Sequence, residues 1–501
     1  MPRRHKHTLS YYRLLTGDMG NLYPCGLTEV LPGDTFQHSA NIFLRMSPLA
    51  APVMHPIQVR VHHFFNAHRL TWPDDGAGGG WENFITAGED GDDAQTVPTA
   101  PLSGVANDLY DYFGLPAESG VEVSSLPVRC YNQIFNEWYR DQDLVDKRAE
   151  DDTSIAKIAW EKDYWTMARP WPQKGPNVTL PVGARAPVVG IGKDTQTFPG
   201  TNTTVFETGA SGSTDYDSHA WIDQDVPDQS WRIEEDPDNP GFPGIYADLS
   251  SADAIPINEF RRAFALQRYA EARAKYGSRY VEYLRYIGAN PADQRIQRPE
   301  YLGGGKVRIS TSEVLQTSDD AGGPNDRFGV GDLYGHGVAA MRSNRYRRTF
   351  QEHGYVMTLL SVRPKAIYTA GAERHWLRRD RNDYWQRELE HIGQQEIWNG
   401  EVFVESGDTP TETYGTWGYQ DRYREYREAQ NRVAGEFRDT LDYWHLARQF
   451  ANRPALNGSF VECDPSKRIY NVQNQHGLWM AVQHSLVARR FVSRNAAGRI
   501  L

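Results

Sequence analysis

Thr35-Phe-Gln-His-Ser-Ala-Asn-Ile-Phe-Leu-Arg-Met46 is the stretch that decides the fold, because its apolar side chains recur at every second residue. The recurring positions, one of them a histidine, are Phe36, His38, Ala40, Ile42, Leu44 and Met46. A period of two is typical of a β-strand that buries one face. Leu31-Pro-Gly-Asp34 has the composition of a turn in front of that strand. The sequence therefore predicts a strand over residues 35–46.

The same alternation occurs at residues 58–65, and we expect further strands at residues 306–310 and 355–368. Helical signals interrupt this pattern. Asn258 is a suitable N-cap for a helix that ends at Gly277, and Ser278 is one for a second helix that reaches Ile287. Two more helices are predicted at residues 132–143 and 436–449. Strands interrupted by capped helices favour one antiparallel sandwich or jelly roll, with the helices in its loops, over a parallel α/β sheet.

The composition suits a large folded protein without a membrane span. Of the 501 residues, 39% are hydrophobic and 24% are charged, which excludes wholesale disorder. No apolar run reaches the length of a membrane-spanning helix. The basic start of the sequence is not followed by the apolar segment of a secretory signal. The three cysteines lie far apart, so we expect reduced, buried thiols in a reducing compartment.

Charge is distributed unevenly along the chain. The net charge is −11. Residues 206–250 contain eleven acidic residues and a single basic one, Arg232, so this window carries −10 of that total. It is also rich in Gly, Ser, Thr and Pro, which is typical of a long surface excursion.

Three other regions are basic: the N-terminus, residues 342–381, and an acid-free stretch at residues 465–501. Each could simply be a solvated face. Together with the acidic excursion they indicate a molecule with one acidic face and one basic face, the latter suited to a polyanion. The candidate DNA-binding residues are Arg3, Arg4, Lys6, Arg342, Arg345, Arg347, Arg348, Arg489, Arg490, Arg494 and Arg499. The alternative for each of them is an ion pair with a carboxylate of another protein subunit.

The motifs that suggest catalysis or metal binding are incomplete. His62 and His63 would point to opposite faces of a strand, so the group His55, His62, His63 and His68 is better explained as structural than as a metal site. Residues 89–93 are acidic but lack calcium-loop spacing. The glycines at 303–305 precede a strand rather than a helix, which excludes a phosphate loop. We therefore expect no catalytic residue, metal or cofactor, although a β-sandwich enzyme or lectin acting on glycans stays an alternative.

Several longer segments are more specific than any of these motifs. Met46-Ser-Pro-Leu-Ala-Ala-Pro-Val-Met-His-Pro-Ile-Gln-Val-Arg60 and Tyr131-Asn-Gln-Ile-Phe-Asn-Glu-Trp-Tyr-Arg-Asp-Gln142 resemble the major capsid protein of the Microviridae, most closely the gokushovirus type. Five further segments share this resemblance in the same order, namely residues 27–36, 168–176, 257–268, 297–304 and 418–423. The matching region runs from about residue 9 to residue 460, and little matches beyond it.

The resemblance implies an eight-stranded antiparallel viral jelly roll with long, helix-containing loop insertions, formed by residues 1–501 as a single capsid domain. It implies a virion protein without catalytic residues or cofactor, assembled in the host bacterial cytoplasm as 60 copies in a T=1 icosahedral shell around circular single-stranded DNA. Further expected partners are small internal DNA-binding, scaffolding and pilot proteins and a host receptor, with no membrane. Residues 185–254 correspond to the acidic surface insertion that forms threefold spikes, with a role in host attachment. The DNA-facing role of the basic stretch at residues 465–501 rests on charge alone.

Overall fold

The computed structural model describes residues 3–76, 79–87, 95–176, 257–276, 279–290, 292–293, 297–315 and 333–494, together with four short strands between residues 177 and 256. The chain divides into two compact units. The first consists of residues 1–174 and 271–501, and the second of residues 175–270.

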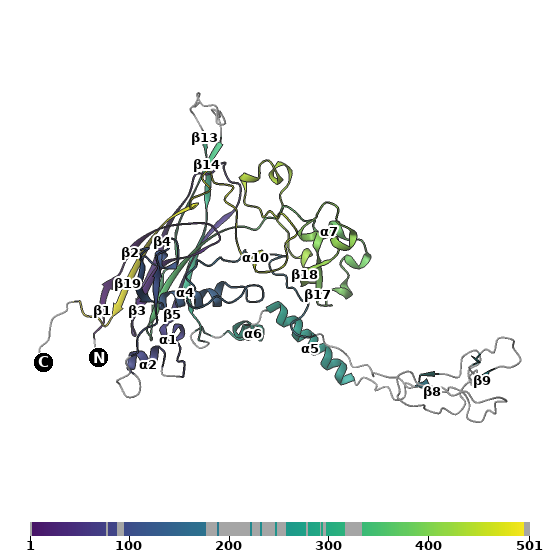
Figure 1. The fold of residues 1–501 in the computed structure, drawn as a ribbon, viewed down its shortest axis with the longest axis horizontal. Coiled ribbons are helices and arrows are strands. Elements are labelled where there is room, and N and C mark those ends of the chain that lie inside the picture. Colours follow the sequence, from purple (N-terminus) through teal and green to yellow (C-terminus); the bar gives the residue numbers. More distant parts are fainter. Residues whose placement is uncertain are drawn as a thin grey trace. The chain divides into compact units, whose positions relative to one another are not determined.

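The first unit contains an antiparallel seven-stranded sheet (Figure 1). Its central strands are β4 (Thr35–Met46) and β19 (Leu478–Arg490), which pair along most of their length. On one side, β1 (His5–Thr8) and β2 (Tyr11–Gly17) share the free edge of β19. On the other side, β14 (Leu333–Arg342) and β15 (Tyr346–Thr349) share the edge of β4, and β13 (Ser310–Leu315) follows β14.

An antiparallel four-stranded sheet packs against the seven-stranded one. Its order is β12 (Glu300–Arg308), β5 (Ile57–Ala67), β16 (Gly354–Pro364) and β3 (Leu22–Val30). Val59, Val61 and Leu360 of this sheet form one hydrophobic core with Ile42 and Val482 of the other. Because successive side chains along a strand point to opposite faces of the sheet, this arrangement buries one side of each sheet. The predicted jelly-roll sandwich is confirmed, whereas the number of eight strands is not.

The outer face of the four-stranded sheet is covered by the chain's own insertions. Phe64 and Met357 pack there in a second core with residues of α4 (Leu126–Ile134), which continues as a π-helical turn (Phe135–Tyr139), and with Trp165 of the following loop. The Tyr131 hydroxyl of α4 donates to the Leu22 carbonyl oxygen at 2.7 Å. Long segments between strands therefore complete one side of the sandwich.

The remaining elements of the first unit are short. They comprise α1 (His68–Thr71), α2 (Trp81–Thr86), α3 (Leu109–Tyr112), α6 (Tyr280–Tyr286), α7 (Arg374–Leu377), α8 (Asn399–Val402), α9 (Pro410–Thr413), α10 (Gly458–Val461), and two hairpins, β6 (Thr99–Ser103) with β7 (Ser119–Ser124) and β17 (Gln394–Trp398) with β18 (Thr416–Asp421).

In the second unit, β8 (Val188–Val189) pairs with β11 (Tyr246–Ala247), and β9 (Trp221–Ile222) pairs with β10 (Trp231–Arg232). The helix α5 (Ile257–Tyr276) begins in this unit and ends in the first. Most of the predicted insertion at residues 185–254, and the acidic residues 89–93, lie outside the described residues.

Several predicted boundaries change. The helix expected at residues 132–143 begins at Leu126, one residue before Pro127, and its π-helical turn ends at Tyr139. The strand expected at residues 355–368 ends at Pro364, and residues 306–310 span the end of β12 and the start of β13. The second helix begins at Tyr280 with Arg279 as its N-cap, and Ser278 lies outside the described residues.

The helix predicted at residues 436–449 is wrong. Only two 3-10 turns, Gly435–Arg438 and Asp442–Trp444, form there. Tertiary contacts take the place of helical hydrogen bonds, because the Arg448 amide donates to the Ile367 carbonyl oxygen at 2.8 Å. The guanidinium of the same residue lies 4.2 Å from the centre of the Phe460 ring. The spacing of apolar residues in this segment cannot predict that a buried arginine forms such tertiary contacts, which override the local helix propensity.

Candidate nucleic-acid interface

Cations from three distant parts of the sequence meet at one end of the seven-stranded sheet. A cavity of about 520 Å³ there is lined by Arg3, Arg4, His5, Lys6, Thr35, Arg347, Arg489 and Arg494. We call the six Arg and Lys residues of this group the basic corner. All six were candidates from the sequence, and no carboxylate is among the described residues that line the cavity.

Strand pairing explains how the basic corner forms. Lys6 of β1 lies directly opposite Arg489 of β19, and Arg489 lies opposite Thr35 of β4. Directly opposed residues of an antiparallel pair share a face, with Cβ atoms about 5 Å apart, and like charges there are destabilising. The fold thus holds two cations side by side at a cost in stability. A bound anion would remove that cost.

Two of the sequence candidates are engaged inside the subunit. Arg490 points away from its neighbour Arg489, and its guanidinium donates to the fully buried Asp34 carboxylate at 2.7 Å. In the same way Arg348 forms an ion pair with Glu300 at 2.7 Å. Both residues therefore hold strands together, and we leave them out of the candidate interface.

The other candidates have different settings. Arg345 is exposed and donates to the side-chain oxygen of Gln37 at 3.0 Å. Arg342 is exposed and lines a separate hollow on the same sheet. Arg499 lies outside the described residues.

The outer face of the seven-stranded sheet continues from the basic corner and is unusual in two ways. The strands β1, β2, β4, β14, β15 and β19 contain no Asp or Glu at all. In the part of the chain that the structure describes, large apolar side chains on this face stay open to solvent. Tyr12 is 59%, Leu14 74%, Phe43 44% and Trp479 44% exposed.

Sequence analysis missed this aromatic part of the face, together with Arg45, whose guanidinium lies 5.7 Å from the centre of the Phe43 ring. A signal was present. The residue numbers of Trp479 and Arg489 differ by ten, and those of Phe43 and Arg45 differ by two, so both differences are even. Within one strand such residues share a face. The alternation that predicts the buried side of the strands therefore also places these exposed side chains together on the opposite side.

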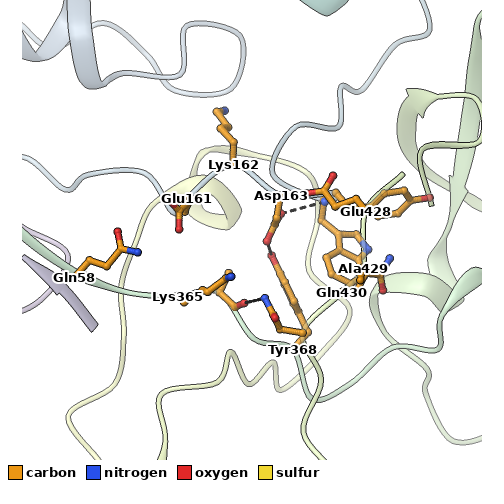
Figure 2. A pocket seen from close by; sticks show the side chains of 13 residues that line it. Gln58, Glu161, Lys162, Asp163, Lys365, Tyr368, Glu428, Ala429 and Gln430 are labelled. Atoms are coloured by element: carbon orange, nitrogen blue, oxygen red, sulfur yellow. Dashed lines mark hydrogen bonds between the residues drawn. The ribbon is translucent and has the colours of Figure 1, made fainter. Parts of the chain in front are cut away.

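A polar pocket elsewhere in the first unit does not have the features of a catalytic site. It measures about 360 Å³ and contains Glu161, Lys162, Asp163, Lys365 and Tyr368 (Figure 2). The Tyr368 hydroxyl donates a hydrogen bond to the Asp163 carboxylate at 2.7 Å, and Arg60 donates one to Glu161 at 2.8 Å. Burial raises the pKa of Tyr368 well above its usual value, so this phenol is no base near neutral pH. The polar groups of this pocket therefore hold the surrounding loops together.

Two histidines of β5 and the three cysteines make their contacts inside the protein. His62 bonds to the Tyr139 hydroxyl at 2.6 Å, whereas His63 points to the other side of β5 and bonds to Thr358 at 2.9 Å. Within the described ranges, no three His, Cys, Asp or Glu side chains are grouped so as to hold a metal ion. Cys25, Cys130 and Cys463 are free and buried, and burial raises the pKa of each thiol to about 12.

Three histidines form a buried network between the two sheets, which we call the interior histidine network: His38, His63 and His484. His484 Nε2 donates to the Cys25 carbonyl oxygen at 3.0 Å, so its Nδ1 accepts from His38 Nε2, also at 3.0 Å. The Tyr346 hydroxyl then donates to His38 Nδ1 at 3.1 Å. This directed chain requires neutral imidazoles. Burial lowers the pKa of His38 to about 3 and of His484 to about 4, and that of His63 well below its usual value.

Comparison with known proteins assigns a family. A family model described as "Capsid protein (F protein)" matches residues 1–494. The protein "Capsid protein VP1" of Bdellovibrio phage phiMH2K is similar, with 33% identity over 92% of this chain and 88% of its own length. The VP1 capsid protein of Chlamydia phage 1 is 32% identical over 94% and 91%, and that of Spiroplasma virus 4 is 29% identical over 93% and 88%.

These matches confirm the resemblance inferred from the sequence segments. None of the helices among the described residues is long and apolar enough to cross a membrane. With a family model that covers nearly the whole chain and relatives that match over nine-tenths of it, the chain belongs to the phage capsid protein (F protein) family of the Microviridae.

Proposed function

We propose that this protein assembles as 60 copies into a T=1 shell around circular single-stranded DNA, with the outer face of the seven-stranded sheet turned toward the genome. As a member of its family the protein is a structural capsid component rather than an enzyme, and it self-assembles into a shell that encloses the genome. One observation carries the orientation. Six cations converge on one corner of the sheet face formed by β1, β2, β4, β14, β15 and β19, and these six of the seven strands contain no acidic residue.

The contrast between the two sheets supports this orientation. Loops and α4 cover the outer face of the four-stranded sheet in a packed core. The outer face of the seven-stranded sheet instead keeps Tyr12, Leu14 and Trp479 exposed. A shell subunit needs one side for the outside and one for its contents. An acid-free face with clustered cations suits a polyanion, because each contact with a phosphate releases counterions without reading the base sequence.

Removing charge from the basic corner should weaken DNA binding in a salt-dependent way. We expect the triple variant Lys6→Gln, Arg347→Gln, Arg489→Gln of the full-length subunit to bind oligo(dT) less tightly at low salt. The slope of log affinity against log salt should shrink by about 2, since single strands lose roughly 0.7 per phosphate contact. Binding is measured by fluorescence titration at several salt concentrations.

A matched control removes three exposed cations from another part of the first unit: Arg381→Gln, Arg387→Gln, Arg427→Gln. It should keep the original salt slope. Particles with the basic-corner substitutions should contain less DNA, while empty shells keep their stability, because Lys6 and Arg489 repel each other in the free subunit. If empty shells lose as much stability as filled ones, these cations join subunits and the DNA assignment is wrong.

We further propose that residues 185–254 form a surface insertion with a role in host attachment. The support is sequence-based, namely the concentration of negative charge and turn-forming residues in this window. Replacing it with a short Gly-Ser link should leave the shell able to assemble while adsorption to host cells falls. Electron microscopy and an adsorption assay measure the two effects. A shortened chain that no longer folds would show that the insertion belongs to the core.

A further inference from the structure

Large and small side chains alternate across the exposed face of the seven-stranded sheet. Ala481 of β19 pairs with Leu14 of β2 on one side and with Phe43 of β4 on the other, and Phe43 in turn pairs with Ala340 of β14. Directly paired residues share a face. The two alanines therefore form low points on either side of the Phe43 ring.

Both low points are hollows. The first, of about 460 Å³, has Ala481 on its floor and Leu14, Phe43, Arg45 and Trp479 among its lining residues. The second, of about 600 Å³, shares Phe43 and Ala481 with the first and is also lined by Tyr12, Asn41, Ala340, Arg342 and Gln483. We call them the first and second base hollows.

We propose that the two base hollows bind unpaired nucleobases, which stack on Phe43, Trp479 and Tyr12 while Arg45 and Arg342 contact the phosphates. This site rests on the proposed function, because the same sheet face must meet the genome. It adds a second kind of recognition to the charge of the basic corner. Every base has a π face, so stacking is tolerant of sequence, as the packaging of a whole genome requires.

The spacing on the sheet fits a stacked ring. Phe43 and Trp479 are diagonal neighbours, since Ala481 lies opposite Phe43 and Trp479 is two residues away on the same strand. Diagonal neighbours on one face are roughly 7–8 Å apart. A planar base between two rings needs two contacts of about 3.5–4 Å each. One base therefore fits between these two side chains.

The chemistry of the lining favours a nucleic acid over an apolar protein segment. Cations and amides lie among the aromatic side chains, including Arg45, Arg342, Asn41 and Gln483. A helix from another protein would instead need a continuous apolar stripe. Asp111 is the single carboxylate among the described residues that line the two hollows. Its Oδ2 already accepts from the Asn107 amide at 2.8 Å.

The test compares an oligo(dT) strand with an abasic strand of the same length. Trp479→Ala and Phe43→Ala in the full-length subunit should each weaken oligo(dT) binding by roughly five- to a hundredfold, the range of one lost base stack. Neither should change the salt slope, because no cation is removed. Binding of the abasic strand should stay the same, since that strand has no ring to stack. Trp479→Phe should restore most of the affinity for oligo(dT).

Trp376→Ala is the matched control, because this tryptophan is 76% exposed on α7, outside the two sheets. It should leave both affinities unchanged. Equal losses of affinity for the oligo(dT) and abasic strands, or no loss of affinity at all, would overturn the proposal that the hollows bind bases. A normal salt slope in the same experiment would leave the DNA-facing role of the sheet intact. Absence of any salt-dependent binding by the unmodified subunit would instead remove the proposed function. A change in oligomeric state of Trp479→Ala without DNA would assign the hollows to a second copy of the chain and overturn the proposal.

Discussion

Acidification from pH 6.5 toward pH 4 should unfold the isolated subunit, because the interior histidine network must stay neutral in the folded sandwich. Burial lowers the pKa of His38 to about 3 and of His484 to about 4, and lowers the pKa of His63 as well, to which the neighbouring histidines add. The hydrogen bond to the Cys25 carbonyl opposes this lowering of the His484 pKa, while the Arg13 cation adds to it. The other groups that face the network are the Tyr11 and Tyr346 rings and hydroxyl side chains.

The direction follows from the folded and unfolded pKa values. An unfolded histidine has a pKa near 6.5, so between that value and about 4 the unfolded chain binds more protons than the folded one. The free energy of unfolding therefore has its full value above pH 6.5 and falls as the pH drops through this window. Each buried histidine contributes a slope of about 1.4 kcal/mol per pH unit, so the three together contribute a slope of about 4 kcal/mol per pH unit.

Urea unfolding of the full-length subunit at several pH values between 7 and 4.5 measures this slope. His63→Gln keeps a donor and an acceptor for Thr358 and Ser343. It should reduce the slope of the unfolding free energy against pH by the contribution of one histidine, about 1.4 kcal/mol per pH unit. A free energy of unfolding that stays constant down to pH 4.5 would mean that the network admits water or charge, contrary to its burial.

The second large effect concerns Glu401, which is fully buried beneath the insertions that cover the four-stranded sheet. Its Oε1 accepts from the Arg374 guanidinium at 2.7 Å and from the Trp398 amide at 3.0 Å, and its Oε2 accepts from the Tyr164 hydroxyl at 2.9 Å. Burial raises the pKa of this carboxyl, while Arg374 opposes that rise. One carboxylate thus connects α7, α8 and the loop that contains Tyr164.

Glu401→Ala should destabilise the subunit by about 3–5 kcal/mol, because it removes the closer of the two carboxylates that balance the buried Arg374 cation and leaves only Glu425, at 3.7 Å. Chemical unfolding and limited proteolysis of the 365–460 region should both report the loss. Glu388→Ala, an exposed carboxylate in the same region, is the control and should change stability little. Adding Arg374→Met to Glu401→Leu should recover part of the loss, since an apolar pair of similar volume can replace a buried ion pair. A loss below about 1 kcal/mol for Glu401→Ala would show that the pair contributes no more than a surface contact.

The predicted strands were found where each buries one face and exposes the other. In β4, Ile42 and Leu44 face the core while Asn41 and Phe43 face outward, and this alternation is visible in the sequence. The helix at residues 436–449 failed for the opposite reason. There the position of Arg448 is decided by Phe460 and Tyr368, which are neighbours in space only.

The sequence identified the cations of the basic corner, but it did not show which of the neighbouring arginines face that surface. Clusters of charge in the sequence identified Arg347, Arg348, Arg489 and Arg490 together. Adjacent residues of a strand point to opposite faces, so only one of each pair can reach a given surface. The inward-pointing member of each pair forms an ion pair, Arg490 with Asp34 and Arg348 with Glu300. Each carboxylate is distant in sequence from its arginine. Applying the strand period to the charges as well as to the apolar residues would have separated the pairs.

The pairing of β19 with β1, β2 and β4 has a consequence for synthesis in the cell. Residues 478–490 provide the middle strand of the basic and aromatic face, yet their partners lie among the first 46 residues. A ribosome must therefore translate past Arg490, and the strand must leave the exit tunnel, before this face can form. Contacts this distant along the chain also close slowly. The nascent polypeptide consequently cannot present the finished surface to the messenger RNA, a long single-stranded polyanion, until residues 478–490 have left the ribosome.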